Sequence, residues 1–193
     1  MVCLMSTLAC SLLLATVARG TAPPGGMQIG SVSQPLIAAD GSTYLIFLPP
    51  KWSRDALHPV LLFLHGVGGI NNAHGCRDPG LSTQLPLLNA TYAARVTHIV
   101  IVPIARRSSW RHHFASAIAL VDMALSDLRG DPSRVAIGGQ SMGAHGAYLY
   151  ASELAPGRFC AVVVMCGYLD EDWDDDMLPT VASALKSTPI WVL

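Results

Sequence analysis

Five mainly apolar stretches of the chain each have about the length of a β-strand. They are HPVLLFLHG (58–66), THIVIVPIA (97–105), SRVAIGG (133–139), RFCAVVVMCG (158–167) and PIWVL (189–193). Continuous apolar runs of this length are typical of strands that are covered on both faces, as in a parallel sheet. Upstream, residues 34–50 form two extended runs that meet at Asp40-Gly41, a dipeptide that favours a tight β-hairpin turn.

Helical patterns separate these runs. Between Phe114 and Leu128 the large apolar residues recur at steps of three, four and three, which places them on one helical face: Ile118, Val121, Leu125 and Leu128. Gly130-Asp131-Pro132 should stop this helix, and the compositions of 142–154 and 178–187 predict two more. Strands and helices that alternate in this way predict an α/β fold with a mostly parallel central sheet.

The segment Gly139-Gln140-Ser141-Met142-Gly143 has the form G-x-S-x-G and lies between a predicted strand and a predicted helix. The pattern alone is weak, because a glycine-rich turn can hold an incidental serine, but the strand before it and the helix after it are the context of a nucleophile elbow. Flanking glycines permit the sharp turn that exposes the serine Oγ. Ser141 is therefore the candidate nucleophile, and the backbone N–H of Met142 is a candidate oxyanion donor.

A second oxyanion donor has to come from another loop at the same edge of the sheet. The segment His65-Gly66-Val67-Gly68-Gly69 directly follows a predicted buried strand. The N–H of Val67 is the first choice for this donor, and that of Gly68 is the second.

These motifs resemble the α/β-hydrolase superfamily, in particular secreted esterases related to polyhydroxybutyrate depolymerases and feruloyl esterases. The resemblance runs from about Tyr44 to Leu193 and is most specific in DPSRVAIGGQSMGAHGAYLYASELAPGRFCAVVVMCG. Ala144 stands where that group usually has a second glycine after Ser-Met-Gly. The resemblance implies a sheet flanked by helices behind an N-terminal hairpin and an acyl-enzyme at the serine. No C-x-x-C or Cys/His spacing suggests zinc, and we expect no cofactor or metal.

The resemblance also implies a Ser-Asp/Glu-His triad in that chain order, with the acid after a late strand and the histidine beyond it. After Ser141 the chain has only His145, which on a helix points away from the serine tip. His65 is expected to support the oxyanion loop, and His58 and His98 to lie at strand starts on the wrong side of the sheet. Three further histidines have no stronger claim to be the base: His74, His112 and His113.

The acidic run 170–176 is a weak source for the triad acid, because a long, unselective charge run is usually a solvated loop. Its candidates are Asp170, Glu171, Asp172 and Asp174. We therefore expect the acid and the histidine beyond Leu193, so that residues 33–193 form a partial hydrolase domain that lacks its C-terminal strands. Two other interpretations stay open: an inactive hydrolase-fold binding protein, and a serine peptidase of the prolyl oligopeptidase kind.

The composition of the chain bears on where the protein acts and on what it binds. Residues 1–20 hold an apolar run from about Leu8 to Val17 that ends in small residues, which predicts a secretory signal peptide, and 21–32 read as a Pro/Gly linker. The net charge of −1 gives no electrostatic reason to expect nucleic acid, and the signal run is too short for a membrane span. A small-molecule or polymeric ester is the expected partner. Cys160 and Cys166, at the ends of an apolar run, are expected to be small buried hydrophobes.

Overall fold

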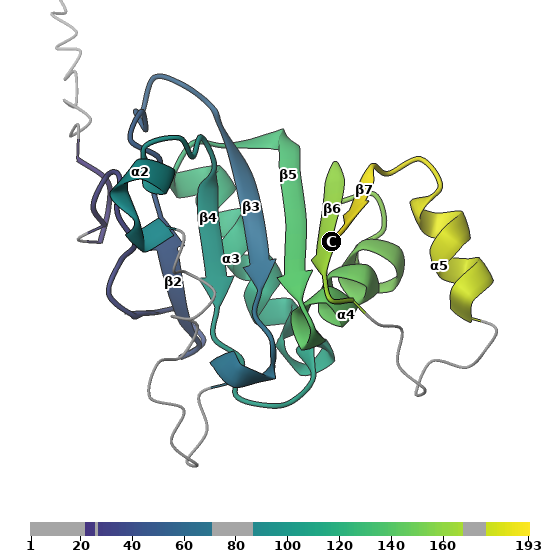
Figure 1. Ribbon diagram of the computed structural model, residues 1–193. Helices are drawn as coiled ribbons and strands as arrows, with labels where there is room; N and C mark the ends of the chain where they lie inside the picture. Colours follow the sequence, from purple (N-terminus) through teal and green to yellow (C-terminus); the bar gives the residue numbers. More distant parts are fainter. Residues whose placement is uncertain (1–21, 26, 71–86, 168–176) are drawn as a thin grey trace, which may run out of the picture.

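A computed structural model describes residues 22–25, 27–70, 87–167 and 177–193, and seven strands of this part form one sheet in the order β1-β2-β4-β3-β5-β6-β7 (Figure 1). The strands are β1 Leu36–Ile37, β2 Thr43–Phe47, β3 His58–Leu64, β4 Ile99–Pro103, β5 Gly130–Gln140, β6 Ala161–Met165 and β7 Ile190–Val192. The helical elements are η1 Val67–Gly69, α2 Ala90–Ala93, η2 Trp110–His113, α3 Phe114–Asp127, α4 Met142–Leu149, η3 Tyr150–Leu154 and α5 Met177–Leu185. The α/β fold with a mostly parallel sheet is thus confirmed.

Strands β3 to β7 are parallel to one another, whereas the β1–β2 hairpin adds two antiparallel strands at one side. The hairpin turns at Gly41, whose φ of 79° suits glycine, as Asp40-Gly41 predicts. The chain passes from β3 to β4 on one side and then returns to β5 on the other side of β3. In open α/β sheets ligands bind at such a reversal, outside the carboxyl ends of the strands. The loop after β3 and the turn after β5 meet at this place.

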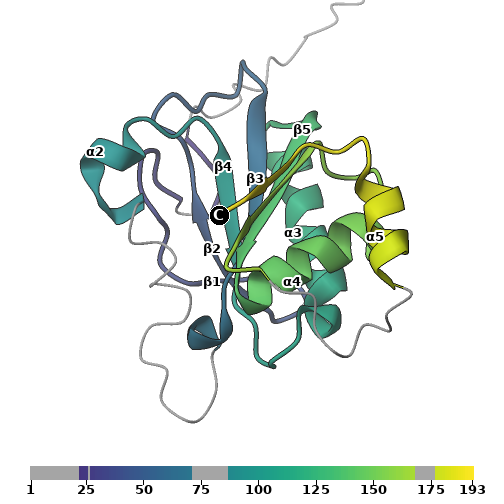
Figure 2. The same cartoon turned by 45° about the vertical axis from the view of Figure 1, so that its right-hand side comes forward.

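The main core lies between one face of the sheet and the helices α3, α4 and α5, which both views show on the same side (Figures 1 and 2). A second, smaller apolar cluster covers the other face of β2 and β4 under α2. Because β4 has both clusters around it, all five of its residues are buried. Strands β3 and β6 instead alternate buried and half-buried residues, so the expectation that they are covered on both faces is wrong for the described part of the chain.

Helix α3 forms where its periodicity predicts it, but its buried face is turned relative to the expected one. The large side chains of Ile118 and Leu125 are only half-buried. The predicted Val121 is buried, and beside it on the buried face lie Leu120 and two small residues that periodicity in large side chains overlooks, Ala117 and Ala124. Alanines at this face let the helix axis approach the sheet closely. The helix ends at Asp127, and Gly130 already begins β5, so 130–132 belong to the strand rather than to a separate stop.

Cys160 and Cys166 are free and exposed, so the expectation that they are buried is wrong. They stand one residue outside each end of β6, where the strand no longer covers them. Residues 1–20 and the acidic run 170–176 lie outside the described residues. No helix of the described part is both long and apolar enough to cross a bilayer.

Candidate active site

Ser141 occupies the turn between β5 and α4, as the G-x-S-x-G pattern predicts. Its backbone has φ 52° and ψ −120°, a conformation that residues with a Cβ rarely adopt and that costs about 1–3 kcal/mol. Three hydrogen bonds hold it: the Ser141 N–H donates to Met165 O at 2.9 Å, and its carbonyl accepts from the N–H groups of Ala144 and His145 at 2.8 and 3.1 Å. The strained turn is therefore fixed to both β6 and the first turn of α4.

The two glycines of the pattern stand where the backbone segments approach most closely. A Cβ on Gly139 would lie 2.0 Å from Gly143 O, and a Cβ on Gly143 would lie 1.8 Å from Leu64 O. No side chain fits at either distance, so α4 rests directly on the end of β3 and on the turn that precedes it. This contact sets the position of the Met142 N–H relative to the loop after β3.

The loop after β3 lies beside Ser141. A Cβ on Gly66 would be 3.5 Å from Ser141 Cβ and 3.3 Å from Gln140 O. The loop continues into η1, in which Gly69 N–H donates to Gly66 O at 3.0 Å and Ile70 N–H donates to Val67 O at 3.2 Å. Among the described residues, neither the Val67 N–H nor the Met142 N–H has an acceptor. Both are thus available at the edge where Ser141 lies.

A buried hydrogen-bond network anchors this loop. The fully buried His65 has Nδ1 2.7 Å from Gly66 O, and its Nε2 accepts the Ala105 N–H at 3.0 Å, so the ring is the neutral tautomer that carries its proton on Nδ1. The Trp110 indole N–H donates to His65 O at 3.1 Å. The Tyr150 hydroxyl in turn donates to Trp110 O at 2.7 Å. The network connects the segment after β4 and the end of α4 to the candidate oxyanion loop.

The electrostatics of His65 fit a supporting role rather than that of a base. Burial lowers its pKa below the ordinary value of 6.5, and the positive charge of His113 lowers it further, while the hydrogen bond to Gly66 opposes this. Both ring nitrogens are already engaged, as described above. The expectation that His65 supports the loop is consistent with these contacts.

No other described histidine binds Ser141 through its side chain. In the part of the chain that the structure describes, no side chain forms a hydrogen bond with Ser141 Oγ. His58 and His98 lie at the amino ends of β3 and β4, at the opposite edge of the sheet, as expected. His58 Nε2 accepts the Ser53 N–H at 3.1 Å, and His113 Nε2 accepts the Arg106 N–H at 3.2 Å. His145 lies one turn into α4.

His74 and all four acidic candidates, Asp170, Glu171, Asp172 and Asp174, lie outside the described residues. The described site therefore holds the nucleophile turn and the two donor positions of the predicted constellation, without a base or acid.

No pattern in the sequence indicates the Trp110–Tyr150 part of the network. Its members are 40 to 45 residues from the groups that they bind. An aromatic residue after a strand and a tyrosine in a helix occur in proteins for many structural reasons. Their contact is therefore visible only in the three-dimensional structure.

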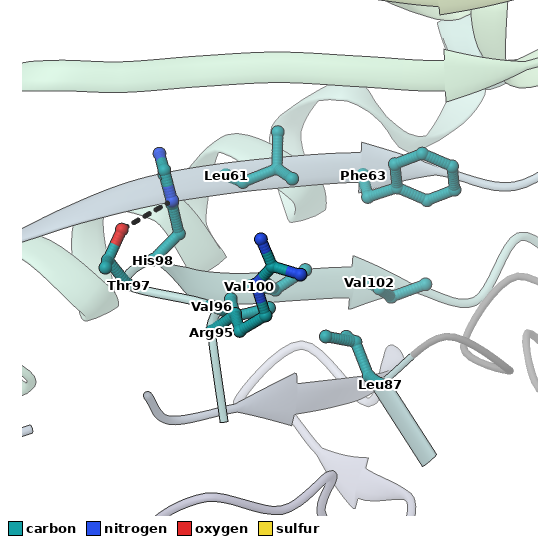
Figure 3. Close-up of a pocket in the computed structure, with 9 residues that line it drawn as sticks. All are labelled: Leu61, Phe63, Leu87, Arg95, Val96, Thr97, His98, Val100 and Val102. Atoms are coloured by element: carbon teal, nitrogen blue, oxygen red, sulfur yellow. Dashed lines mark hydrogen bonds between the residues drawn. The ribbon is translucent and has the colours of Figure 1, made fainter. Parts of the chain in front are cut away.

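An apolar hollow of about 390 Å³ lies on the second face of the sheet, away from α3 and α4 (Figure 3). Its walls come from alternating residues of β3 and β4 and from the segments on both sides of α2: Leu61, Phe63, Leu87, Arg95, Val96, Thr97, His98, Val100 and Val102. Burial lowers the pKa of His98 at its rim, and the charge of Arg134 adds to this effect. Neither Ser141 nor the loop after β3 lines this hollow.

Comparison with protein families identifies the chain. Residues 40–191 match the family described as "Putative esterase". The chain belongs to this esterase family. The match begins at the hairpin turn and ends in β7, so it contains the elbow and the loop after β3. No protein in the curated collection matches the chain significantly.

Solved structures resemble this esterase-family chain in fold. A thermostable esterase is 23% identical with a TM-score of 0.63, and the alignment covers 82% of this chain and 44% of that protein. An S-formylglutathione hydrolase from Staphylococcus aureus is 16% identical with a TM-score of 0.56, with 87% and 78% covered. A ferulic acid esterase is 18% identical with a TM-score of 0.51, with 82% and 69% covered. The chain thus spans less than half the length of the thermostable esterase.

Proposed function

We propose that this chain carries the nucleophile and the oxyanion hole of a serine ester hydrolase that works through an acyl-enzyme at Ser141. The observation that supports this most strongly is the strained backbone of Ser141 between β5 and α4, with the loop after β3 beside it. Strained conformations of this kind persist only where the surrounding structure enforces them, and they cluster at active sites. Membership of the esterase family makes a carboxylic ester the natural substrate.

In this mechanism Ser141 Oγ attacks the carbonyl carbon of the ester while a base takes its proton. The carbonyl oxygen becomes an oxyanion that accepts hydrogen bonds from the N–H groups of Val67 and Met142, and each such donor is worth about 3 kcal/mol. The alcohol leaves with the proton from the base, and water then hydrolyses the acyl-serine in the reverse sequence of proton transfers. We assign the base and its acid to segments outside the described residues.

The substrate in this proposal is a small-molecule or polymeric ester, and the site of action is outside the cell. The apolar run of residues 1–20 supports export, and expression of the intact gene tests it. Export predicts that the mature protein in the medium starts near residue 21. Retention of Met1 in a protein that stays inside the cell would contradict this part of the proposal.

Labelling by a fluorophosphonate tests the role of Ser141 in the full-length product of the gene. We expect one phosphonyl group on the peptide that contains Ser141, and none in Ser141→Ala. Ser152→Ala is a matched control, because Ser152 stands in η3, directly after α4, and its hydroxyl donates to Tyr148 O. A folded full-length protein that takes up no label would support a binding protein instead and would reject the proposal.

A further inference from the structure

A polar cleft of about 370 Å³ opens at the same edge of the sheet as Ser141, beyond β4. Its walls are the hairpin turn before β2, the segment after β4 and the start of α3. The residues that decide its chemistry are Asp40, Arg106, Arg107, His112, His113 and Ser116. Successive strands lie about 4.8 Å apart, so in the order β2-β4-β3-β5 the cleft is roughly 10–15 Å from the elbow.

The cleft contains an excess of positive charge. The Arg106 guanidinium donates to the neutral carbonyl of Gly41 at 2.7 Å, and within the described residues neither Arg106 nor Arg107 pairs with a carboxylate. Two guanidinium groups and one acid thus line the cleft, in a chain whose net charge is −1. The excess is local to this part of the surface.

The one acid in the cleft, Asp40, already has its hydrogen-bonding partners. One of its oxygens accepts from the N–H and the hydroxyl of Ser42 at 2.9 and 2.6 Å, and the other accepts from the Ser116 hydroxyl. These hydrogen bonds, that of Ser116 first, lower the pKa of Asp40 to about 2. Asp40 is therefore ionised at neutral pH and directed toward serines rather than toward the arginines.

His113 lies in the cleft among several positively charged groups. Burial lowers its pKa most, and the positive charges of His112, Arg107 and Arg106 lower it further. His113 also accepts the Arg106 N–H and packs edge-on against Trp110, whose indole supports the loop after β3. The cleft thus shares a wall with the network beside Ser141.

We infer that this cleft binds a carboxylate group through Arg106 and Arg107. Arginine offers two parallel N–H donors that match a carboxylate, and two arginines without acidic partners supply the charge that it needs. A carboxylate suits the cleft better than a phosphate dianion, because the nearby Asp40 repels a second negative charge on the group that is bound. The carboxylate belongs either to a free ligand or to the far end of an ester that is bound at Ser141, and only the second source rests on the proposed function.

Binding of sodium glutarate to the full-length protein tests the inference without any catalysis. We expect saturable binding by calorimetry that weakens with added salt, together with a rise in the pKa of His113 by NMR. Arg107→Gln should weaken binding about tenfold or more. Arg106→Gln should do the same, whereas Arg95→Gln, an exposed arginine beside α2, should leave binding unchanged. Absence of saturable binding, or equal binding by Arg107→Gln, would overturn the inference.

Hydrolysis rates of two esters distinguish a free carboxylate ligand from a carboxylate at the far end of the substrate. The substrates are the mono(4-nitrophenyl) ester of dodecanedioic acid, which is long enough to reach from the elbow to the cleft, and the neutral 4-nitrophenyl dodecanoate. If the substrate supplies the carboxylate, Arg107→Gln lowers kcat/KM about tenfold for the acidic ester alone. If the ligand is free, glutarate binding falls while both kcat/KM values stay unchanged, and the inference stands with that source. An inactive protein that still binds glutarate would reject the proposed function but not this site.

Discussion

Replacing Gly143 by alanine should change the stability of the protein in two opposing ways, and the structure allows their sizes to be compared. Helix propensity alone predicts that the change stabilises α4 by about 1 kcal/mol, because alanine loses less backbone entropy than glycine. The added Cβ would, however, stand 1.8 Å from Leu64 O, and it needs at least about 3.0 Å. Helix α4 would have to move by more than 1.2 Å, the difference between these two values, away from β3.

We expect the steric effect to win. Overpacking of a well-filled contact costs typically 1–3 kcal/mol and occasionally more, and here the contact is backbone against backbone, which cannot rotate away. For this backbone contact we expect a steric cost of about 4 kcal/mol, above the typical range, which less the gain of about 1 kcal/mol leaves a net loss of about 3 kcal/mol in the free energy of unfolding. Such a loss would lower Tm by about 6–12 °C in a domain of this size. Circular dichroism during heating and during urea titration measures both quantities.

Gly68→Ala is the matched control for this experiment. A Cβ on Gly68 meets no atom within 4 Å, and its φ is not in the left-handed region. Its free energy of unfolding should stay within about 0.5 kcal/mol of the unchanged protein. If Gly143→Ala is as stable as Gly68→Ala, the close approach of α4 to β3 is wrong, and with it the position of the Met142 N–H.

Two further predictions concern the buried network. Tyr150→Phe removes the hydroxyl that donates to Trp110 O, and the buried carbonyl left without its donor should cost about 1–3 kcal/mol in urea unfolding, whereas Tyr92→Phe on the surface should cost almost nothing. Equal losses in these two variants would refute the network. The lowered pKa of His65 means that the folded state binds fewer protons, so its contribution to stability is complete above about pH 6.5 and is lost as the pH falls toward the lowered value. Urea unfolding between pH 8 and 5 should show a decline of up to about 1.4 kcal/mol per pH unit for each such histidine, and His65→Gln should make it shallower; an unchanged slope would contradict a neutral, buried His65.

The sheet and the elbow could be predicted because their signals are local. Apolar runs of strand length mark β3, β4 and β6, and Ser141 falls between a strand and a helix that the sequence itself indicates. The burial of each face of a strand could not be predicted in this way. An apolar run shows that both faces could be buried, but it does not show whether another element packs on them. The half-buried positions of β3 and β6 are the result.

Contacts between distant segments account for the other differences. The buried face of α3 is set by alanines such as Ala117, which let the helix approach the sheet and which a search for large apolar residues passes over. Cys166 is exposed because β6 ends one residue earlier, and a composition argument does not locate that end. The anchoring of the candidate oxyanion loop by Trp110 joins groups that are 45 residues apart, beyond the reach of any periodicity.

The central claim is that an acyl group forms a covalent bond to Ser141. Rapid mixing of the full-length protein with 4-nitrophenyl acetate, an acid quench within milliseconds and mass spectrometry of the peptides test it directly. We predict one acetyl group on the peptide that contains Ser141, a burst of about one equivalent of 4-nitrophenol, and neither signal in Ser141→Ala. Hydrolysis at an undiminished rate by Ser141→Ala, or an acetyl group on another residue, would contradict it.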